Sequence, residues 1–92
     1  MIELTLVSSN LEDDKKVMES EVSNFYFHFV DSNSALMKKE AYTIKTDWGA
    51  RKEPFALVKV QDKVLRCFYS EEDNNVIDKA LEFVKNLQET YG

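Results

Sequence analysis

Two apolar segments in the C-terminal half constrain the fold of this chain more than any other feature. Residues Phe55–Val60 and Val64–Tyr69 are rich in β-branched and aromatic side chains, which favours strands. Only Gln61-Asp62-Lys63 separates the two segments. A connection this short joins antiparallel neighbours, so the sequence predicts a tight β-hairpin.

The N-terminal part predicts a strand, a helix and a second strand. Apolar and polar residues alternate from Met1 to Val7, which is typical of a strand. Ser8, Ser9 or Asn10 can cap the helix that follows, and the apolar face of that helix comprises Leu11, Met18, Val22 and Phe25. An aromatic strand is expected at about Phe25–Val30. Two strands joined through a helix form a right-handed parallel crossover.

Two further helices complete the predicted order. Ala35–Ile44 reads as a short helix, and Thr46–Glu53 as an exposed loop that ends at Pro54. Ser70 is expected to open the last helix, with Asp73 as a weak capping-box partner. The apolar stripe of that helix comprises Val76, Ile77, Ala80, Leu81, Val84, Leu87 and Tyr91. The order β-α-β-α-β-β-α predicts one α/β domain over residues 1–92, with a mixed four-stranded sheet between helices.

Composition excludes several classes of function. The chain has 92 residues and one cysteine, so it forms no internal disulfide, no Cys-x-x-Cys pair and no multi-cysteine zinc site. Its net charge of −5 disfavours nucleic acid and anionic membranes as main partners. No apolar run approaches the roughly 20 residues of a membrane span, and no targeting pattern opens the chain. We therefore expect a cytoplasmic protein.

The predicted order resembles the thioredoxin fold in its glutaredoxin-like form, over nearly the whole chain. The segment Lys52-Glu53-Pro54-Phe55-Ala56-Leu57-Val58 occupies the place of the family's Thr-Val-Pro segment. The resemblance implies a cis peptide bond before Pro54, and it implies that the backbone of Glu53 docks a peptide or thiol. A trans proline at the start of a strand is the alternative.

The chain departs from this family where the family carries its catalytic cysteine. The corresponding segment runs from Val7 to Asp14 and contains no thiol. Serine cannot replace a thiolate in disulfide exchange, and the acids at residues 12–14 would raise the pKa of any thiol there. The family also binds glutathione at the start of its final helix, where Ser70 and Glu71 stand here with added acids. We expect no catalytic residue, no cofactor and no glutathione binding.

The remaining chemically versatile residues have structural interpretations. Cys67 is expected to be a buried apolar residue on the strand face of Leu65 and Tyr69, a reactive thiol being the alternative. For His28, local spacing reveals no nucleophile or orienting carboxylate, so a structural or partly exposed histidine is expected. The acidic clusters Glu12-Asp13-Asp14 and Glu71-Glu72-Asp73 could hold a divalent cation, but both suit helix N-termini, and no metal site is predicted.

The loop after the second helix holds the candidate binding residues. Tryptophan and arginine are enriched in interface hot spots, although Trp48 could instead fold back on the helix with Gly49 at positive φ. Single-stranded nucleic acid is a weaker alternative for an acidic chain. The candidate contact residues are Trp48, Arg51, Lys52, Glu53, Pro54 and Ser70.

These observations predict a non-catalytic thioredoxin-like domain that acts by contact with an unidentified protein partner. In fold alone it is similar to accessory proteins of phages and mobile elements. The alternatives are a small-molecule or thiol-ligand binder that uses the groove at Glu53-Pro54, and a redox protein that uses Cys67 with an external thiol.

Overall fold

The computed structural model describes residues 2–22 and 26–91, and the side chains up to residue 90. Within these ranges the order of elements is the predicted one. The elements are β1 (Ile2–Ser8), α1 (Leu11–Glu21), β2 (Tyr26–Asp31), α2 (Lys38–Asp47), β3 (Phe55–Val60), β4 (Lys63–Tyr69) and α3 (Val76–Tyr91).

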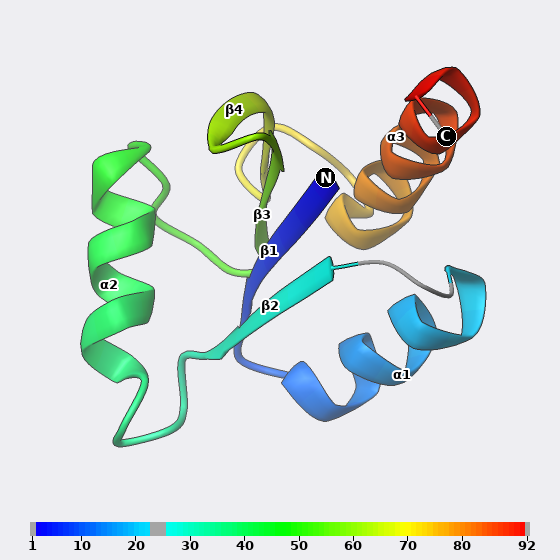
Figure 1. Cartoon of the computed structure of the whole chain (residues 1–92). Coiled ribbons are helices and arrows are strands. Elements are labelled where there is room, and N and C mark those ends of the chain that lie inside the picture. Colours follow the sequence, from blue (N-terminus) through cyan, green and yellow to red (C-terminus); the bar gives the residue numbers. More distant parts are fainter. Residues whose placement is uncertain (1, 23–25, 92) are drawn as a thin grey trace.

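The strands form one mixed four-stranded sheet in the order β2-β1-β3-β4. β1 and β2 are parallel, whereas β3 is antiparallel to both β1 and β4. Figure 1 shows α2 on one face of the sheet and α1 and α3 on the other. The predicted α/β fold class, with helices flanking both faces of the sheet, is confirmed.

The larger core lies between the sheet and helices α1 and α3. Alternate strand residues point to this face, which is why β-strand periodicity predicted them. The buried members are Leu4, Leu6, Ala56, Val58 and Phe68 from the sheet, Met18 and Val22 from the α1 segment, and Val76, Ala80, Leu81 and Val84 from α3. The predicted apolar faces of both helices are confirmed, except that Phe25 and the side chain of Tyr91 lie outside the described residues.

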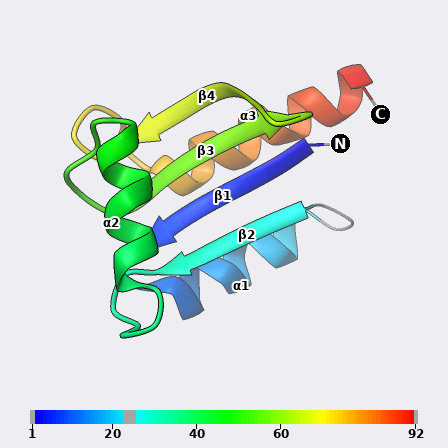
Figure 2. The ribbon, with the colours of Figure 1, turned by 60° about the vertical axis from the view of Figure 1, so that its left-hand side comes forward.

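A smaller core lies under α2. Val30, Val7, Phe55 and Tyr69 are neighbours in register across the four strands. Helix α2 adds few apolar side chains to this row, chiefly the buried Ala41 with the partly buried Ile44. Figure 2 shows that α2 lies across the end of the sheet at which β1, β2 and β4 finish. This face of the sheet is therefore covered by one short helix.

The predicted tight hairpin between β3 and β4 is confirmed, but its loop is one residue shorter than expected, because Lys63 already belongs to β4 and pairs with Val60. Gln61 and Asp62 have φ values of 51° and 68°, as a two-residue type I′ turn requires. The pairing then shifts, because Val58 faces Arg66 whereas Lys59 faces Val64, so Leu65 is an extra residue in β4.

This bulge corrects one expectation about the faces of β4. Val64, Cys67 and Tyr69 pack against the smaller core, and Tyr69 shares the face of Cys67 as predicted. Leu65 was expected on the same face, but it is 47% exposed and lies outside that cluster. Simple alternation fails here because the extra residue changes which side chains point to each face.

Three predicted helix boundaries were wrong: the start and the end of the second helix, and the start of the last helix. The second helix begins at Lys38 rather than at Ala35, because Met37 N–H donates to the carbonyl of Ser34 in a separate turn. It also ends later, at Asp47. The second strand begins at Tyr26, and the expected first residue, Phe25, lies outside the described ranges.

The last helix begins at Val76, not at Ser70. Asp73 does not cap the helix, because its carboxylate accepts the N–H of Tyr69 at 3.0 Å. Asn75 then turns the chain with a φ of 58° before α3 starts. The acids at residues 71–73 thus lie in the loop before the helix and not in its first turn.

Candidate functional site

The predicted contact residues come from loops at one end of the sheet. β1, β2 and β4 end there and β3 begins there, so the loops that follow or precede these strand ends are neighbours (Figure 2). The candidates Trp48, Arg51, Lys52, Glu53, Pro54 and Ser70 all lie in or beside these loops.

Pro54 occupies the first position before β3, and the Glu53–Pro54 peptide bond is cis. The cis bond implied by the family resemblance is therefore confirmed. The carbonyl of Pro54 accepts a hydrogen bond from the Ser70 hydroxyl at 2.5 Å. This bond joins the loop before β3 to the loop after β4, so Ser70 holds the loop in place instead of starting a helix.

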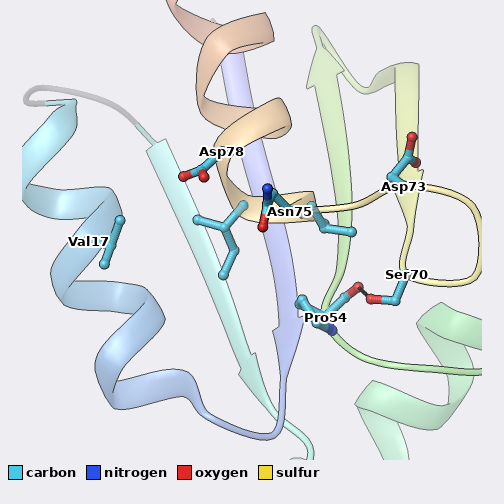
Figure 3. Close-up of a pocket in the computed structure, with 8 residues that line it drawn as sticks. Val17, Pro54, Ser70, Asp73, Asn75 and Asp78 are labelled. Atoms are coloured by element: carbon cyan, nitrogen blue, oxygen red, sulfur yellow. Dashed lines mark hydrogen bonds between the residues drawn. The ribbon is translucent and has the colours of Figure 1, made fainter.

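Pro54 and Ser70 line a pocket of about 390 Å³ between α1, Pro54 and the start of α3 (Figure 3). Its other lining residues are Val17, Asp73, Asn75, Val76, Ile77 and Asp78. The lining thus combines apolar side chains with the acidic residue Asp78, whereas the carboxylate of Asp73 is bound to the N–H of Tyr69 and to Lys79. Such a pocket favours a neutral or cationic ligand over an anion, since like charges repel at short range.

The side chain of Glu53 binds within the protein. Its carboxylate accepts hydrogen bonds from Lys45 Nζ and, at 2.8 Å, from Ser32 Oγ. Burial raises the pKa of Glu53, but the hydrogen bonds from Lys45 and Ser32 outweigh it and lower the pKa overall. Glu53 is therefore a charged residue that ties the loop before β3 to α2 and to the β2–α2 loop.

Glu71 holds the same loop from the other side. Its carboxylate accepts the backbone N–H groups of Arg51 at 3.2 Å and Lys52 at 3.0 Å. Sequence reasoning assigned this acid to a helix N-terminus and missed the contact. The only local signal was an acidic residue close to Ser70.

Trp48 lies on the surface at the C-terminal end of α2. Its side chain is 40% exposed, and its carbonyl accepts a hydrogen bond from the Tyr69 hydroxyl at 2.7 Å. Gly49 follows with a φ of 75°, the left-handed conformation expected from the sequence. The positive φ of Gly49 is the feature that the fold-back interpretation of Trp48 predicted, while the 40% exposure of Trp48 leaves its ring accessible for contact.

A groove of about 440 Å³ lies beside Trp48 on the α2 side of the sheet. It is lined by Tyr42, Lys45, Thr46, Gly49, Ala50 and Arg51. Tyr42 is 69% exposed and was not predicted as a site residue. The sequence indicated its exposure, because an aromatic residue directly after Ala41 does not lie on the apolar face of the predicted helix.

The structure therefore divides the predicted contact set in two. Pro54 and Ser70 face the pocket beside α1 and α3, whereas Arg51 lines the groove beside α2. Trp48 and Lys52 are exposed on the loop next to that groove, and the side chain of Glu53 is engaged with Lys45.

Ser8 ends β1, at the start of the connection to α1, and it is buried. Its hydroxyl donates to Asp14 Oδ2 at 2.5 Å and accepts the N–H of Asn10 at 2.9 Å. The side chain of Asn10 makes no capping hydrogen bond, so Ser8 supplies the polar contact at the start of α1. A buried hydroxyl paired in this way has no access to a substrate.

Cys67 is partly buried in β4 beside Tyr69. Burial raises the pKa of its thiol, with a hydrogen bond from Tyr69 acting in the opposite direction. His28 Nε2 lies 3.1 Å from Glu40 Oε2 across the β2–α2 contact, so the structure supplies a carboxylate neighbour that local spacing did not reveal, and the histidine is partly exposed as expected. Among the described residues, no cluster of three or more His, Cys, Asp or Glu side chains is arranged to hold a metal ion.

Comparisons of this chain with family models, with curated proteins and with solved structures give no match. In the described ranges, none of the helices combines the length and the apolar character that crossing a membrane requires. The candidate functions consequently depend on the geometry of the pocket, the groove and the exposed side chains around α2.

Proposed function

We propose that this chain is a non-catalytic, thioredoxin-like binding domain that acts by contact with another protein. One observation carries the proposal: several large apolar side chains on α2 and its flanks are exposed to solvent. Leu36 and Tyr42 are 95% and 69% exposed, and Trp48 and Met37 are 40% and 37% exposed. Aromatic and Met side chains are enriched at protein interfaces, and burying them against a partner is favourable.

The burial of Ser8 and the raised pKa of Cys67 support a non-catalytic function. Ser8 is buried, and the raised pKa of Cys67 keeps that thiol protonated at neutral pH. We place the protein in the cytoplasm, where an unpaired cysteine is ordinary. The similarity to accessory proteins of phages and mobile elements remains one of fold alone.

The test is affinity capture from a lysate of the source organism with matched aromatic variants. We expect Trp48→Ala and Tyr42→Ala to lose the captured protein. Tyr26→Ala should retain it, because Tyr26 is also exposed, at 60%, but begins β2, at the opposite end of that strand from the candidate loops. Equal capture by all three variants would overturn the proposal.

A second candidate function is small-molecule or thiol-ligand binding, favoured by the pocket of about 390 Å³ at Pro54 and Ser70. Asp78 is among the residues that line this pocket, so an anion such as glutathione should bind poorly. An amide chemical-shift titration tests this: with millimolar glutathione, the signals of Phe55, Ser70 and Glu71 should stay in place. Clear shifts of those signals would establish the ligand-binding function instead.

A further inference from the structure

The segment from Leu36 to Lys52, which comprises α2 and its flanks, is basic in an acidic protein. It contains five basic and two acidic residues, a formal charge of +3, whereas the whole chain carries −5. The rest of the chain therefore carries −8. The exposed side chains of Tyr42 and Trp48 thus lie on a positively charged segment of a negatively charged chain.

Within the described ranges, four of these five basic side chains are in no salt bridge. Lys45 pairs with Glu53, and Glu40 with His28. In the described residues, no salt bridge involves the side chains of Lys38, Lys39, Arg51 or Lys52. The nearby acids are Asp47 and Glu71, and the carboxylate of Glu71 is already bound to two backbone N–H groups.

The unpaired cations flank the groove at both ends. Lys38 and Lys39 precede Tyr42 by four and three residues, and Thr46 follows it by four, so these side chains share one side of α2. Arg51 and Lys52 stand on the loop that forms the other wall. The groove volume of about 440 Å³ lies within the range of sites that enclose a small ligand.

We propose that the partner contributes an acidic segment that bears an apolar or aromatic side chain. This inference depends on the proposed function and specifies its partner. The apolar side chain enters the groove between Tyr42 and Arg51, and flanking carboxylates meet the unpaired lysine and arginine side chains. Charge complementarity of this kind speeds association and selects against basic partners.

A short acidic peptide fits this region better than a nucleic acid does. A single-stranded nucleic acid carries a charge at every nucleotide, so a strand longer than the groove would continue onto the acidic remainder of the surface. A peptide can confine its carboxylates to the few positions that face the cations. Its apolar side chain also uses the exposed rings of Tyr42 and Trp48.

The probe for this inference is a fluorescein-labelled peptide of sequence Asp-Glu-Asp-Leu-Phe-Asp-Glu-Asp, titrated with the full chain at low and at physiological salt. We expect saturable binding that weakens with salt, because exposed charges are screened. The double variant Arg51→Glu with Lys52→Glu should weaken binding about tenfold, since it removes two attractive contacts and introduces repulsion. Tyr42→Ala should weaken it without changing the salt dependence.

The matched control is Lys16→Glu, which reverses a charge on an exposed side chain of α1 and should leave binding unchanged. Circular dichroism verifies that each variant is folded. Equal weakening by Lys16→Glu, or no saturable binding of the peptide, would overturn the inference. Tighter binding of an oligothymidylate of similar length would assign the region to nucleic acid, and self-association abolished by the double variant would assign it to a second copy of the chain.

The same variants separate failure of this inference from failure of the proposed function. Suppose that capture from the lysate depends on Trp48 but is insensitive to salt and to charge reversal at Arg51 and Lys52. The protein-contact function then stands, and the acidic partner is excluded. Capture that does not depend on Trp48 or Tyr42 rejects the proposed function itself.

Discussion

Replacement of Glu53 by glutamine tests how the loop before β3 is held in place. The carboxylate of Glu53 accepts hydrogen bonds from Lys45 and Ser32, and the paired side chains of Lys45 and Glu53 are only 16% and 19% exposed. A hydrogen bond to a charged group contributes about 1.5–3 kcal/mol, whereas a fully exposed ion pair contributes about 0–1 kcal/mol. Glutamine still accepts a hydrogen bond from Ser32 but leaves Lys45 without its counter-charge. We expect Glu53→Gln to reduce the free energy of unfolding at pH 7 by about 2 kcal/mol.

The effect should depend on pH in a defined direction. The pKa of Glu53 in the folded chain is lowered from its ordinary value of 4.5, so in acid the unfolded chain binds a proton more readily than the folded chain does. The contribution of the carboxylate to stability is therefore complete above pH 4.5 and disappears as the pH falls through the lower folded pKa. The difference between wild type and Glu53→Gln should accordingly shrink in acid.

Urea unfolding followed by circular dichroism measures the loss of unfolding free energy in Glu53→Gln at pH 7. The same measurement at several values below pH 4.5 shows how that loss changes with pH. Glu19→Gln is the control, because Glu19 is exposed on α1 and its replacement should change stability by less than about 0.5 kcal/mol. A second variant, Lys45→Met, should recover part of the loss when combined with Glu53→Gln, since the two side chains are coupled. The reasoning is refuted if Glu53→Gln matches the control at pH 7, or if its cost is the same at every pH.

Three further predictions concern the thiol, the turn and the core. Cys67 should react with iodoacetamide at pH 7.5 more slowly than free cysteine, because burial raises its pKa, and Cys67→Ser should leave peptide binding intact; rapid labelling would contradict this. Gly49→Ala should lower the free energy of unfolding in urea by about 1 kcal/mol, because the φ of Gly49 is 75°, and Gly49→Asn should lower it less. Equal stability of the alanine variant and wild type would argue against this. Phe68→Ala should lower the free energy of unfolding in urea by about 3–5 kcal/mol, because Phe68 is buried, whereas Trp48→Ala should lower it by under about 1 kcal/mol. The reverse order would place Trp48 in the core.

The elements could be predicted because their signals are local. Strand alternation in β1 and the three-residue connection Gln61-Asp62-Lys63 are readable without knowledge of the rest of the chain. The start of the last helix was not predictable, since Ser70 bonds to Pro54, 16 residues away. A hydroxyl that finds a distant acceptor is no longer available to cap a helix, and a local pattern cannot reveal that acceptor.

The candidate site was predictable in position but not in arrangement. The loop from Trp48 to Pro54 was recognisable from its composition and from the resemblance around the proline. The residues of this loop are divided between a pocket and a groove. That division depends on the packing of the start of β3 between α2 on one face of the sheet and α1 and α3 on the other. The contact from Glu71 to the backbone of Arg51 and Lys52 spans about 20 residues and likewise has no local signal.

The extra residue in β4 has a consequence for solubility. β4 is an edge strand, and a regular edge presents unpaired N–H and C=O groups that a strand of another molecule can join. The bulge at Leu65 interrupts that spacing, and Lys63 and Arg66 add charge on either side of it. The irregularity that brings Val64 into the smaller core thus also makes this edge a poor template for strand addition, which opposes aggregation through β4.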